Sequence, residues 1–321
     1  MQRGSTLEQL QRSGDDLRVP MDAARRSLGT IILGKDPEIS LALACLVARG
    51  HLLIEDLPGL GKTILAQSLA RVLGMSYQRI QFTSDLLPAD IVGVSVFEQQ
   101  AGEFRFQPGP IFAQLVLADE VNRATPKAQS ALLEAMEEHQ VSVDGVTHEL
   151  PTPYFVVATQ NPSDQIGTFP LPESQLDRFL MRLELGYPNE ENERALLTGA
   201  DRREMLGTVE PTMSPEILLR LQQAASKVHM SDALVDYIQA LVRFTRESPD
   251  IETGLSPRGS LALVAAARAH AFIEQHSGVF PDDVQAVFAA VAGHRLRPAS
   301  SSSYRSPIEL SRHVLDSVAI P

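Results

Sequence analysis

The chain has 321 residues, of which 44% are hydrophobic and 21% charged, and this length predicts about two globular domains with room for a substantial core. The formal charge of −12 argues against a protein that holds nucleic acid on a broad basic surface. A single cysteine, Cys45, rules out an intramolecular disulfide and a multi-cysteine zinc site. With no tryptophan and 5% aromatic residues, the composition also argues against an aromatic stacking platform for single-stranded nucleic acid.

The first part of the chain is polar and then helical. Residues 1–18 are expected to form a loose or short helical lead-in, and residues 19–50 a helical segment that ends at Gly50. The start lacks the apolar stretch of a secretory signal, and no later apolar run approaches the roughly 18 residues that a membrane span needs. We therefore expect a cytoplasmic protein without a membrane span.

Strands and helices alternate after Gly50, which predicts an α/β domain with a mostly parallel sheet covered by helices. Hydrophobic patterning and turn residues define these segments. The expected strands, with a ribbon at 94–106 and a hairpin at 141–146, are a short apolar strand from Leu52, Tyr77–Phe82, Leu115–Ala118 and Tyr154–Thr159. A further helix is expected from Pro126, with Thr125 as its cap.

The character of the sequence changes after Tyr187. Asn189 followed by two glutamates is typical of a helix start, and the pairs Ser214-Pro215, Ser256-Pro257 and Ser306-Pro307 repeat a cap-then-proline signal. No strand is expected beyond Gly186. The predicted domains are therefore 19–187, which would bind nucleotide, and 188–321, which would be helical.

The strongest local signal is the segment Pro58–Thr63, Pro-Gly-Leu-Gly-Lys-Thr, between an expected strand and an expected helix. Gly59 and Gly61 permit a tight turn whose backbone N–H groups face a phosphate, and the helix N-terminus favours negative charge. Lys62 would supply a positive charge to the terminal phosphates, and Thr63 a hydroxyl for Mg²⁺. The predicted nucleotide-binding residues are Pro58, Gly59, Leu60, Gly61, Lys62, Thr63, Ile64 and Asp119.

Acidic residues near this loop have different expected roles. Asp56 stands where the usual pattern has its first glycine, and its carboxylate would disfavour phosphate unless it points away. Asp119 and Glu120 end the apolar strand Leu115–Ala118, at the sheet edge where ligands bind in α/β proteins. Asp119 would hold Mg²⁺ through water, and Glu120 would orient and deprotonate the attacking water. Together with the phosphate loop, the pair predicts phosphoryl transfer to water.

Asn161 follows a third apolar strand, Tyr154–Thr159. We expect this strand to lie between the strands that carry the other two motifs, so that the amide contacts the γ-phosphate or the attacking water. The alternative is an ordinary turn residue, because Asn-Pro is a common turn signal. The joint order of the three motifs favours the catalytic interpretation.

Seen together, these segments resemble the MoxR family of AAA+ ATPases over residues 20–320. The segments that carry the resemblance are Glu55–Thr63, Gln81–Pro88, Pro108–Pro110, Ala118–Ala124, Ala158–Pro162, Phe169–Pro172, Leu176–Phe179 and Ser256–Arg258. The resemblance implies a P-loop AAA+ αβα core with a mostly parallel sheet, followed by an all-helical lid domain. It also implies an ATPase that uses ATP and Mg²⁺ and assembles into a homo-oligomeric ring, expected to be a hexamer.

The resemblance assigns roles to arginines. Arg178 resembles the arginine finger that reaches the ATP of a neighbouring subunit. Arg258 resembles the second sensor of the lid, and its place in the first turn of a helix, where a cation is disfavoured, also favours a ligand-facing role. Arg123 is either a further interface arginine or an ordinary surface residue. The ribbon at 94–106 and the hairpin at 141–150 resemble inserts that face the pore or one surface of the ring; they would otherwise be extra sheet edge.

The function implied by the resemblance is chaperone-like remodelling or activation of a protein client, together with a protein that carries a von Willebrand factor A domain. Two alternatives stay open. A nucleic-acid motor is disfavoured by the charge of −12. A nucleotide-gated binding module that no longer hydrolyses is disfavoured by the presence of Glu120, Asn161 and Arg178.

Overall fold

The centre of the molecule is a five-stranded sheet in the order β2-β5-β8-β1-β9, and every neighbouring pair is parallel. The computed structural model describes residues 4–161, 168–199, 201–300, 302–304 and 306–320, except for the side chains of residues 4–16 and 203. The strands are β1 (Leu52–Glu55), β2 (Tyr77–Gln81), β5 (Leu115–Asp119), β8 (Phe155–Gln160) and β9 (Met181–Leu183). Because all five run the same way, the sheet has one carboxyl edge and one amino edge.

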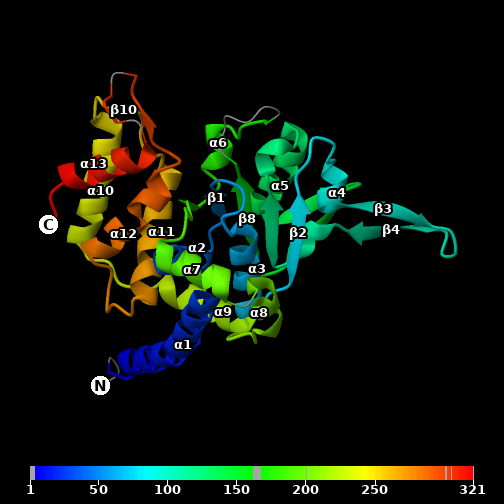
Figure 1. Ribbon diagram of the computed structural model, residues 1–321, viewed down its shortest axis with the longest axis horizontal. Helices are drawn as coiled ribbons and strands as arrows, with labels where there is room; N and C mark the ends of the chain where they lie inside the picture. Colours follow the sequence, from blue (N-terminus) through cyan, green and yellow to red (C-terminus); the bar gives the residue numbers. More distant parts are fainter. Residues whose placement is uncertain (1–3, 162–167, 200, 301, 305, 321) are drawn as a thin grey trace.

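Alternate residues of each strand face opposite sides of the sheet, and both sides are buried. In β5, Leu115 and Leu117 join the hydrophobic core that includes residues of the N-terminal and C-terminal helices, whereas Val116 and Ala118 join a second core with the helix α5. The helices of the first side begin with α1 (Gly4–Ile31), α2 (Asp36–Val47) and α3 (Lys62–Val72), and those of the second are α4 (Pro88–Val92) and α5 (Pro126–Glu138). The predicted αβα arrangement with a parallel sheet is confirmed (Figure 1).

Two antiparallel pairs of strands lie outside the central sheet. The ribbon consists of β3 (Gly93–Glu98) and β4 (Glu103–Pro108), and the hairpin of β6 (Gln140–Val143) and β7 (Val146–Glu149). Both were expected from the sequence. The β3–β4 ribbon projects from the body of the molecule (Figure 1), and its residues Phe97 and Phe104 are 50% and 72% exposed.

The short helical segments η1 (Pro110–Phe112), η2 (Val121–Arg123) and α6 (Glu173–Leu176) connect elements of the core. The chain then continues through α7 (Glu190–Thr198), α8 (Arg202–Thr208), α9 (Pro215–Ala225), α10 (Asp232–Glu247), α11 (Pro257–Ile273), α12 (Pro281–Ala292) and α13 (Pro307–Ser317). Asn189, Ser256 and Ser306 accept hydrogen bonds from backbone N–H groups in the first turns of their helices, as N-caps do. Thr125 and Ser214 occupy cap positions without such a bond. No helix in the described ranges is long and apolar enough to cross a membrane.

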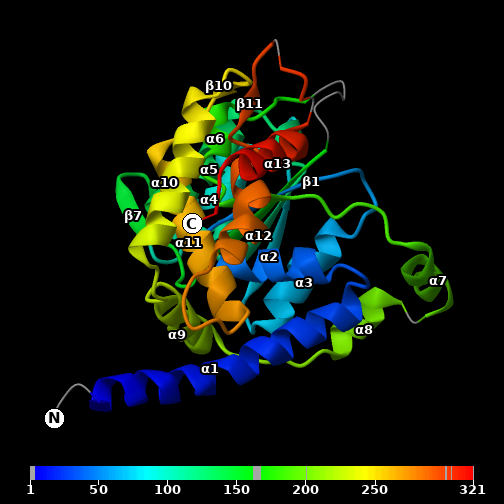
Figure 2. The same ribbon diagram turned by 90° about the vertical axis from the view of Figure 1, so that its left-hand side faces the viewer.

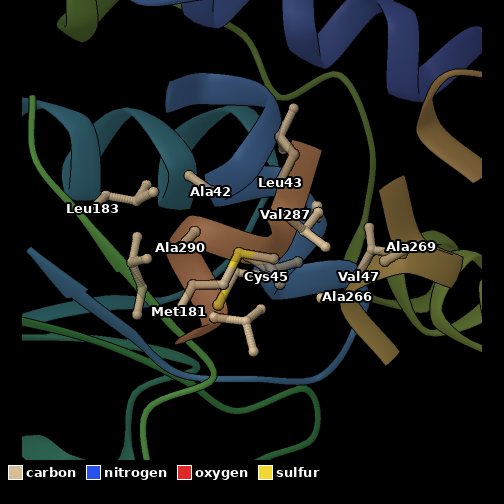
Figure 3. Close-up of a cluster of buried hydrophobic side chains, with 14 of the residues drawn as sticks. Ala42, Leu43, Cys45, Val47, Met181, Leu183, Ala266, Ala269, Val287 and Ala290 are labelled. Carbon is tan, nitrogen blue, oxygen red and sulfur yellow. The ribbon is translucent and has the colours of Figure 1, made fainter. Parts of the chain in front are cut away.

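The C-terminal helices pack against the core through buried apolar side chains. Figure 3 shows Cys45 of α2 beside Met181 of β9, with Ala266 of α11 and Val287 of α12 in the same cluster. Cys45 is fully buried and its thiol donates to the His51 carbonyl (3.4 Å). Burial raises the pKa of this thiol far above its ordinary value, so Cys45 behaves as a packed apolar group.

The N-terminal helices differ from expectation. The helical segment predicted for 19–50 is interrupted, because α1 ends at Ile31 and α2 begins at Asp36. Gly34 adopts a left-handed conformation (φ 66°) in the turn between them, which an α-helix does not accommodate. The helix α1 also reaches back to Gly4, through the region expected as a lead-in, and extends beyond the rest of the molecule (Figure 2).

The prediction that no strand follows Gly186 is wrong. β10 (Ile251–Thr253) and β11 (Arg297–Pro298) form a small antiparallel ribbon among the C-terminal helices. Segments of three and two residues are too short to show a period-two pattern, so the sequence carried no signal for them. The other regular elements that the structure describes after Gly186 are helices.

Candidate functional site

The loop 56–61 connects the carboxyl end of β1 to the start of α3. Gly59 (φ 86°) and Gly61 (φ 87°) adopt left-handed conformations, which favour glycine. Gly61 is the N-cap of α3, and its neighbours Lys62 and Thr63 form the first turn. This arrangement leaves the first N–H groups of the helix for an anion. Of the other predicted residues, Pro58 and Leu60 lie in the loop and Ile64 lies in the first turn of α3.

Asp56, the residue that departs from the usual phosphate-loop pattern, is held by backbone amides. One carboxylate oxygen accepts from Leu57 N (2.8 Å), and the other accepts from Leu185 N (2.8 Å) and Gly186 N (2.6 Å). The carboxylate therefore ties the loop to the chain that follows β9. These contacts give Asp56 a structural role, because both of its carboxylate oxygens are used by backbone N–H groups.

Lys62 lies at the carboxyl edge and is 7% exposed. Its ammonium group donates to the carbonyls of Asp56 and Leu57 and to Asn161 Oδ1 (3.2 Å). Burial lowers the pKa of Lys62, while nearby carboxylates, first that of Asp56 and then that of Asp119, act in the opposite direction. The loop thus holds a desolvated cation at the mouth of the predicted phosphate site.

Asp119 ends β5 and contacts both neighbouring strands. Its Oδ1 accepts from the Thr159 hydroxyl of β8 (2.6 Å), and its Oδ2 accepts from the Arg79 guanidinium of β2 (2.6 Å and 3.1 Å). Among the described residues no cluster of three or more His, Cys, Asp or Glu could hold a metal ion. The Asp119 carboxylate at the end of β5 and the Thr63 hydroxyl in the first turn of α3 are oxygen donors of the kind that suits Mg²⁺, which keeps several waters and binds through one or two protein oxygens plus phosphates.

Glu120 follows Asp119 and has an unusual backbone. Its φ of 57° and ψ of 49° lie in the left-handed region, which is strained for a residue with a side chain and is common at functional sites. Its Oε2 accepts from Gln81 Nε2 (3.1 Å) and Arg123 (2.9 Å), and its Oε1 accepts from Asn161 Nδ2 (3.3 Å). Arg123, whose role the sequence left open, thus contacts the predicted general base of its own chain.

Asn161 joins the three motifs. The strand β8 lies between β5 and β1, as the sequence predicted, and Asn161 follows it directly. The amide is 5% exposed, accepts from Lys62 and donates to Glu120. Pro162, the last residue of that motif, lies outside the described residues. One side chain therefore connects the phosphate loop with the end of β5.

Arg178 and Arg258 lie at the opposite, amino edge. Leu180 N donates to the His51 carbonyl (2.8 Å), directly before β1 begins, so this segment lies where the strands start. There the carboxylate of Glu137, in the last turn of α5, accepts from both Arg178 (3.0 Å) and Arg258 (2.8 Å). Because β1 has four residues and strands rise about 3.3 Å per residue, the two edges are more than about 10 Å apart. The structure therefore brings Lys62, Asn161 and Glu120 together, but not the two arginines with them.

Several residues of this site were missed in the sequence. They are Arg79, Gln81 and Thr159 at the carboxyl edge, and Glu137 and Arg295 at the amino edge. Thr159 carried a usable signal, since a hydroxyl in a buried strand needs a hydrogen-bond partner. The others are charged or polar residues whose partners are distant in sequence.

Comparisons with known proteins identify the family of this chain. Residues 51–181 match the family described as "ATPase family associated with various cellular activities (AAA)", and residues 243–313 match the AAA lid domain. The protein YeaC of Bacillus subtilis (strain 168), described as uncharacterized, is 42% identical over 309 residues, covering 96% of this chain and 97% of its own. Chaperone MoxR1 of Mycobacterium tuberculosis is 41% identical over 308 residues, covering 91% of this chain and 80% of its own.

A solved structure is similar to this chain over nearly its whole length. The crystal structure of a proposed ATPase from Cytophaga hutchinsonii superposes with a TM-score of 0.88 at 33% identity, covering 98% of this chain and 99% of that one. The sequence matches extend over nearly all of the chain, and they include both the αβα core and the helical lid. The chain belongs to the MoxR family of AAA+ ATPases.

Proposed function

We propose that the protein hydrolyses ATP with Mg²⁺ and uses the energy to remodel or activate a protein client. The observation that supports this most is the bridge made by Asn161, which accepts from Lys62 and donates to Glu120. A phosphate-binding cation, a polar amide and a candidate base thereby share one edge of the sheet. Positioning and charge neutralisation of this kind are what phosphoryl transfer to water requires.

The residues divide the chemistry among themselves. The loop Pro58–Thr63 would cradle the phosphates, with Lys62 as their counter-charge. Thr63 and Asp119 would hold Mg²⁺, the latter through water; when bound, the ion neutralises charge on the phosphates. Glu120, oriented by Asn161 and Gln81, would accept a proton from the attacking water.

We propose further that the complete site forms between two subunits. Arg178 and Arg258 are at the far edge of the sheet from their own phosphate loop, and one carboxylate, that of Glu137, holds both. A head-to-tail interface would bring this pair to the ATP of a neighbour, and repetition of that interface closes a ring. We expect a hexamer, in which Arg178 acts as an arginine finger.

The client would be a protein, with a von Willebrand factor A domain protein as a partner. The exposed aromatic side chains of Phe97 and Phe104 on the β3–β4 ribbon support a protein client, because exposed apolar groups on a projecting ribbon favour contact with polypeptide. The charge of −12 argues against nucleic acid in that role.

The variant Glu120→Gln tests the proposed chemistry. The amide cannot accept a proton, so we expect turnover to fall by about 10³-fold while ATP affinity stays within about twofold. Glu134→Gln, an exposed glutamate of α5, is the matched control and should keep normal turnover. The ATP-loaded Glu120→Gln protein should also retain its client in an affinity capture from the host lysate.

Three results would contradict parts of this proposal. Turnover near the normal rate in Glu120→Gln would exclude Glu120 as the base. Absence of turnover in the unsubstituted protein at saturating ATP and Mg²⁺ would favour a nucleotide-gated binding module. Salt-sensitive stimulation of turnover by DNA would favour a nucleic-acid motor.

A further inference from the structure

A buried arginine follows the helix α12 of the lid. Arg295 has a side chain that is 5% exposed, and its guanidinium donates to Asp177 Oδ1 (2.6 Å) in an ion pair. It also donates to the backbone carbonyls of Asp177 (3.1 Å), Phe179 (2.6 Å) and Leu180 (3.1 Å), and to that of Val291 in the last turn of α12. One lid side chain therefore holds nearly the whole stretch 177–180.

This stretch carries Arg178, the predicted finger. Two more lid residues contact it: the His294 ring bonds to the Phe179 carbonyl (3.0 Å), and the Ser256 hydroxyl donates to Asp177 Oδ2 (3.1 Å). Ser256 is the N-cap of α11, whose first turn contains Arg258. The backbone on either side of Arg178 is thus fixed to the lid.

Burying a cation costs free energy that an apolar side chain of similar size would avoid. Arg295 offsets this cost with an ion pair and carbonyl acceptors, most of them from one four-residue segment. A side chain that only filled space would not need this set of acceptors. The contacts instead fix where the segment lies relative to α11 and α12.

We propose that Arg295 is a positioning residue for the arginine finger: it fixes the backbone of Arg178 to the lid, so that the position of the lid determines whether Arg178 reaches the neighbouring site. This inference rests on the proposed function, in which Arg178 acts on the ATP of another subunit. It assigns Arg295 to the donor side of the interface, with no direct part in nucleotide binding by its own chain.

The substitution Arg295→Lys keeps the charge but cannot reproduce the planar set of donors. We expect ATP affinity to stay within about twofold and turnover to fall by about 10²-fold, as misplacement of a catalytic group by about 1 Å can cause. Arg246→Lys is the matched control, because Arg246 donates to the Leu255 carbonyl within the lid itself. Asp177→Asn removes the same ion pair from its other end, and we expect the same effect from it. It replaces Arg295→Lys in the test if that variant does not fold.

Subunit exchange tells a donor-side defect from a general one. A mixture of Arg295→Lys with Glu120→Gln should regain activity, since the first retains its own base and the second donates an intact finger. A mixture of Arg295→Lys with Arg178→Ala should regain none, since both are defective on the donor side. A merely structural role for Arg295 would not produce this pattern.

A reference mixture of Arg178→Ala with Glu120→Gln separates two kinds of failure. If the reference regains activity and the Arg295→Lys mixture with Glu120→Gln does not, the positioning role of Arg295 is overturned and the shared site stands. If the reference itself regains nothing although exchange is verified, the shared site is wrong, and the positioning role is overturned with it.

Discussion

The two edges of the central sheet carry different kinds of charge arrangement. At the carboxyl edge, Lys62, Asn161 and Glu120 are joined side chain to side chain within one chain. At the amino edge, Arg178 and Arg258 meet on the single carboxylate of Glu137. One chain thus contains groups suited to phosphate and water, while its two arginines face away from them. The difference points to a site that needs a second copy of the same chain.

Removing the finger should give the largest effect. Arg178→Ala should lower ATP turnover by about 10³-fold or more, because an arginine finger stabilises charge that develops in the transition state. ATP binding by the same chain should change little, since Arg178 lies at the other edge. Steady-state turnover and ATP titration measure the two effects. Arg243→Ala, an exposed arginine of α10, is the control, and equal losses in both variants would contradict the assignment.

Removing Lys62 should weaken nucleotide binding at the carboxyl edge. Lys62→Ala should weaken ATP binding by about 10²-fold, because a charge-assisted contact to phosphate is lost and Asn161 loses its donor. Calorimetric titration with ATP and Mg²⁺ measures this, with the exposed Lys127→Ala as the control. An unchanged dissociation constant would place the phosphates elsewhere.

Lowering the pH should reduce the free energy of unfolding through His51, which lies at the amino edge. This buried ring accepts from Val156 N (3.0 Å) and contacts the Met136 carbonyl (3.2 Å), and burial lowers its pKa to about 4. In the unfolded chain the pKa is about 6.5, so between these values the unfolded state binds the extra proton and stability falls as the pH falls. The full contribution, about 3 kcal/mol, is present above about pH 6.5 and is lost by about pH 4.

Denaturant unfolding across this pH range measures the His51 contribution. His51→Gln should flatten the pH dependence of the free energy of unfolding. The control His229→Gln, at an exposed position, should leave the dependence unchanged. Identical curves for His51→Gln and the unsubstituted protein would mean that this ring titrates normally in the folded state.

Arg258→Ala should have the smallest effect on the chemistry, a fall in turnover of about tenfold with the fold unchanged, because this guanidinium is about half exposed and partly screened by solvent. Turnover together with thermal unfolding measures it. If Arg258 serves the neighbour, the ATP affinity of an isolated subunit should not change. A variant indistinguishable from the unsubstituted protein in turnover would make Arg258 an ordinary surface arginine.

How far the sequence predicts this molecule differs between the two edges. The residues at the carboxyl edge could be predicted because parallel strands end there together. Once the sheet was predicted, the three separate motifs were expected to lie close to one another. The strand order confirms that Asn161 follows the strand between the other two. The role of Asp56 could not be predicted from the sequence, since its carboxylate accepts hydrogen bonds from Leu185 N and Gly186 N, which lie more than a hundred residues away in the chain.

The amino edge depends on tertiary packing that no local pattern encodes. The helix α5 carries Glu134, Glu137 and Glu138, and nothing in their spacing marks Glu137 as the partner of two arginines. The position of α11 against the core determines which of these glutamates contacts Arg258. The burial of Arg295 has the same origin, because its acceptors lie on a segment that precedes it by more than a hundred residues.

The central claim is that one active site is built from two subunits, and subunit exchange between two inactive variants tests it most directly. Arg178→Ala and Glu120→Gln are mixed in equal amounts under conditions that allow exchange. Each interface then has an intact base with a chance of one half and an intact finger with a chance of one half, so about a quarter of head-to-tail interfaces are complete. We predict that ATP turnover rises from near zero toward that fraction, and to a lower level where Glu120→Gln subunits hold ATP and stall the ring. Verified exchange without any recovery would contradict the shared site and would mean that Arg178 acts within its own subunit or only holds α5 in place.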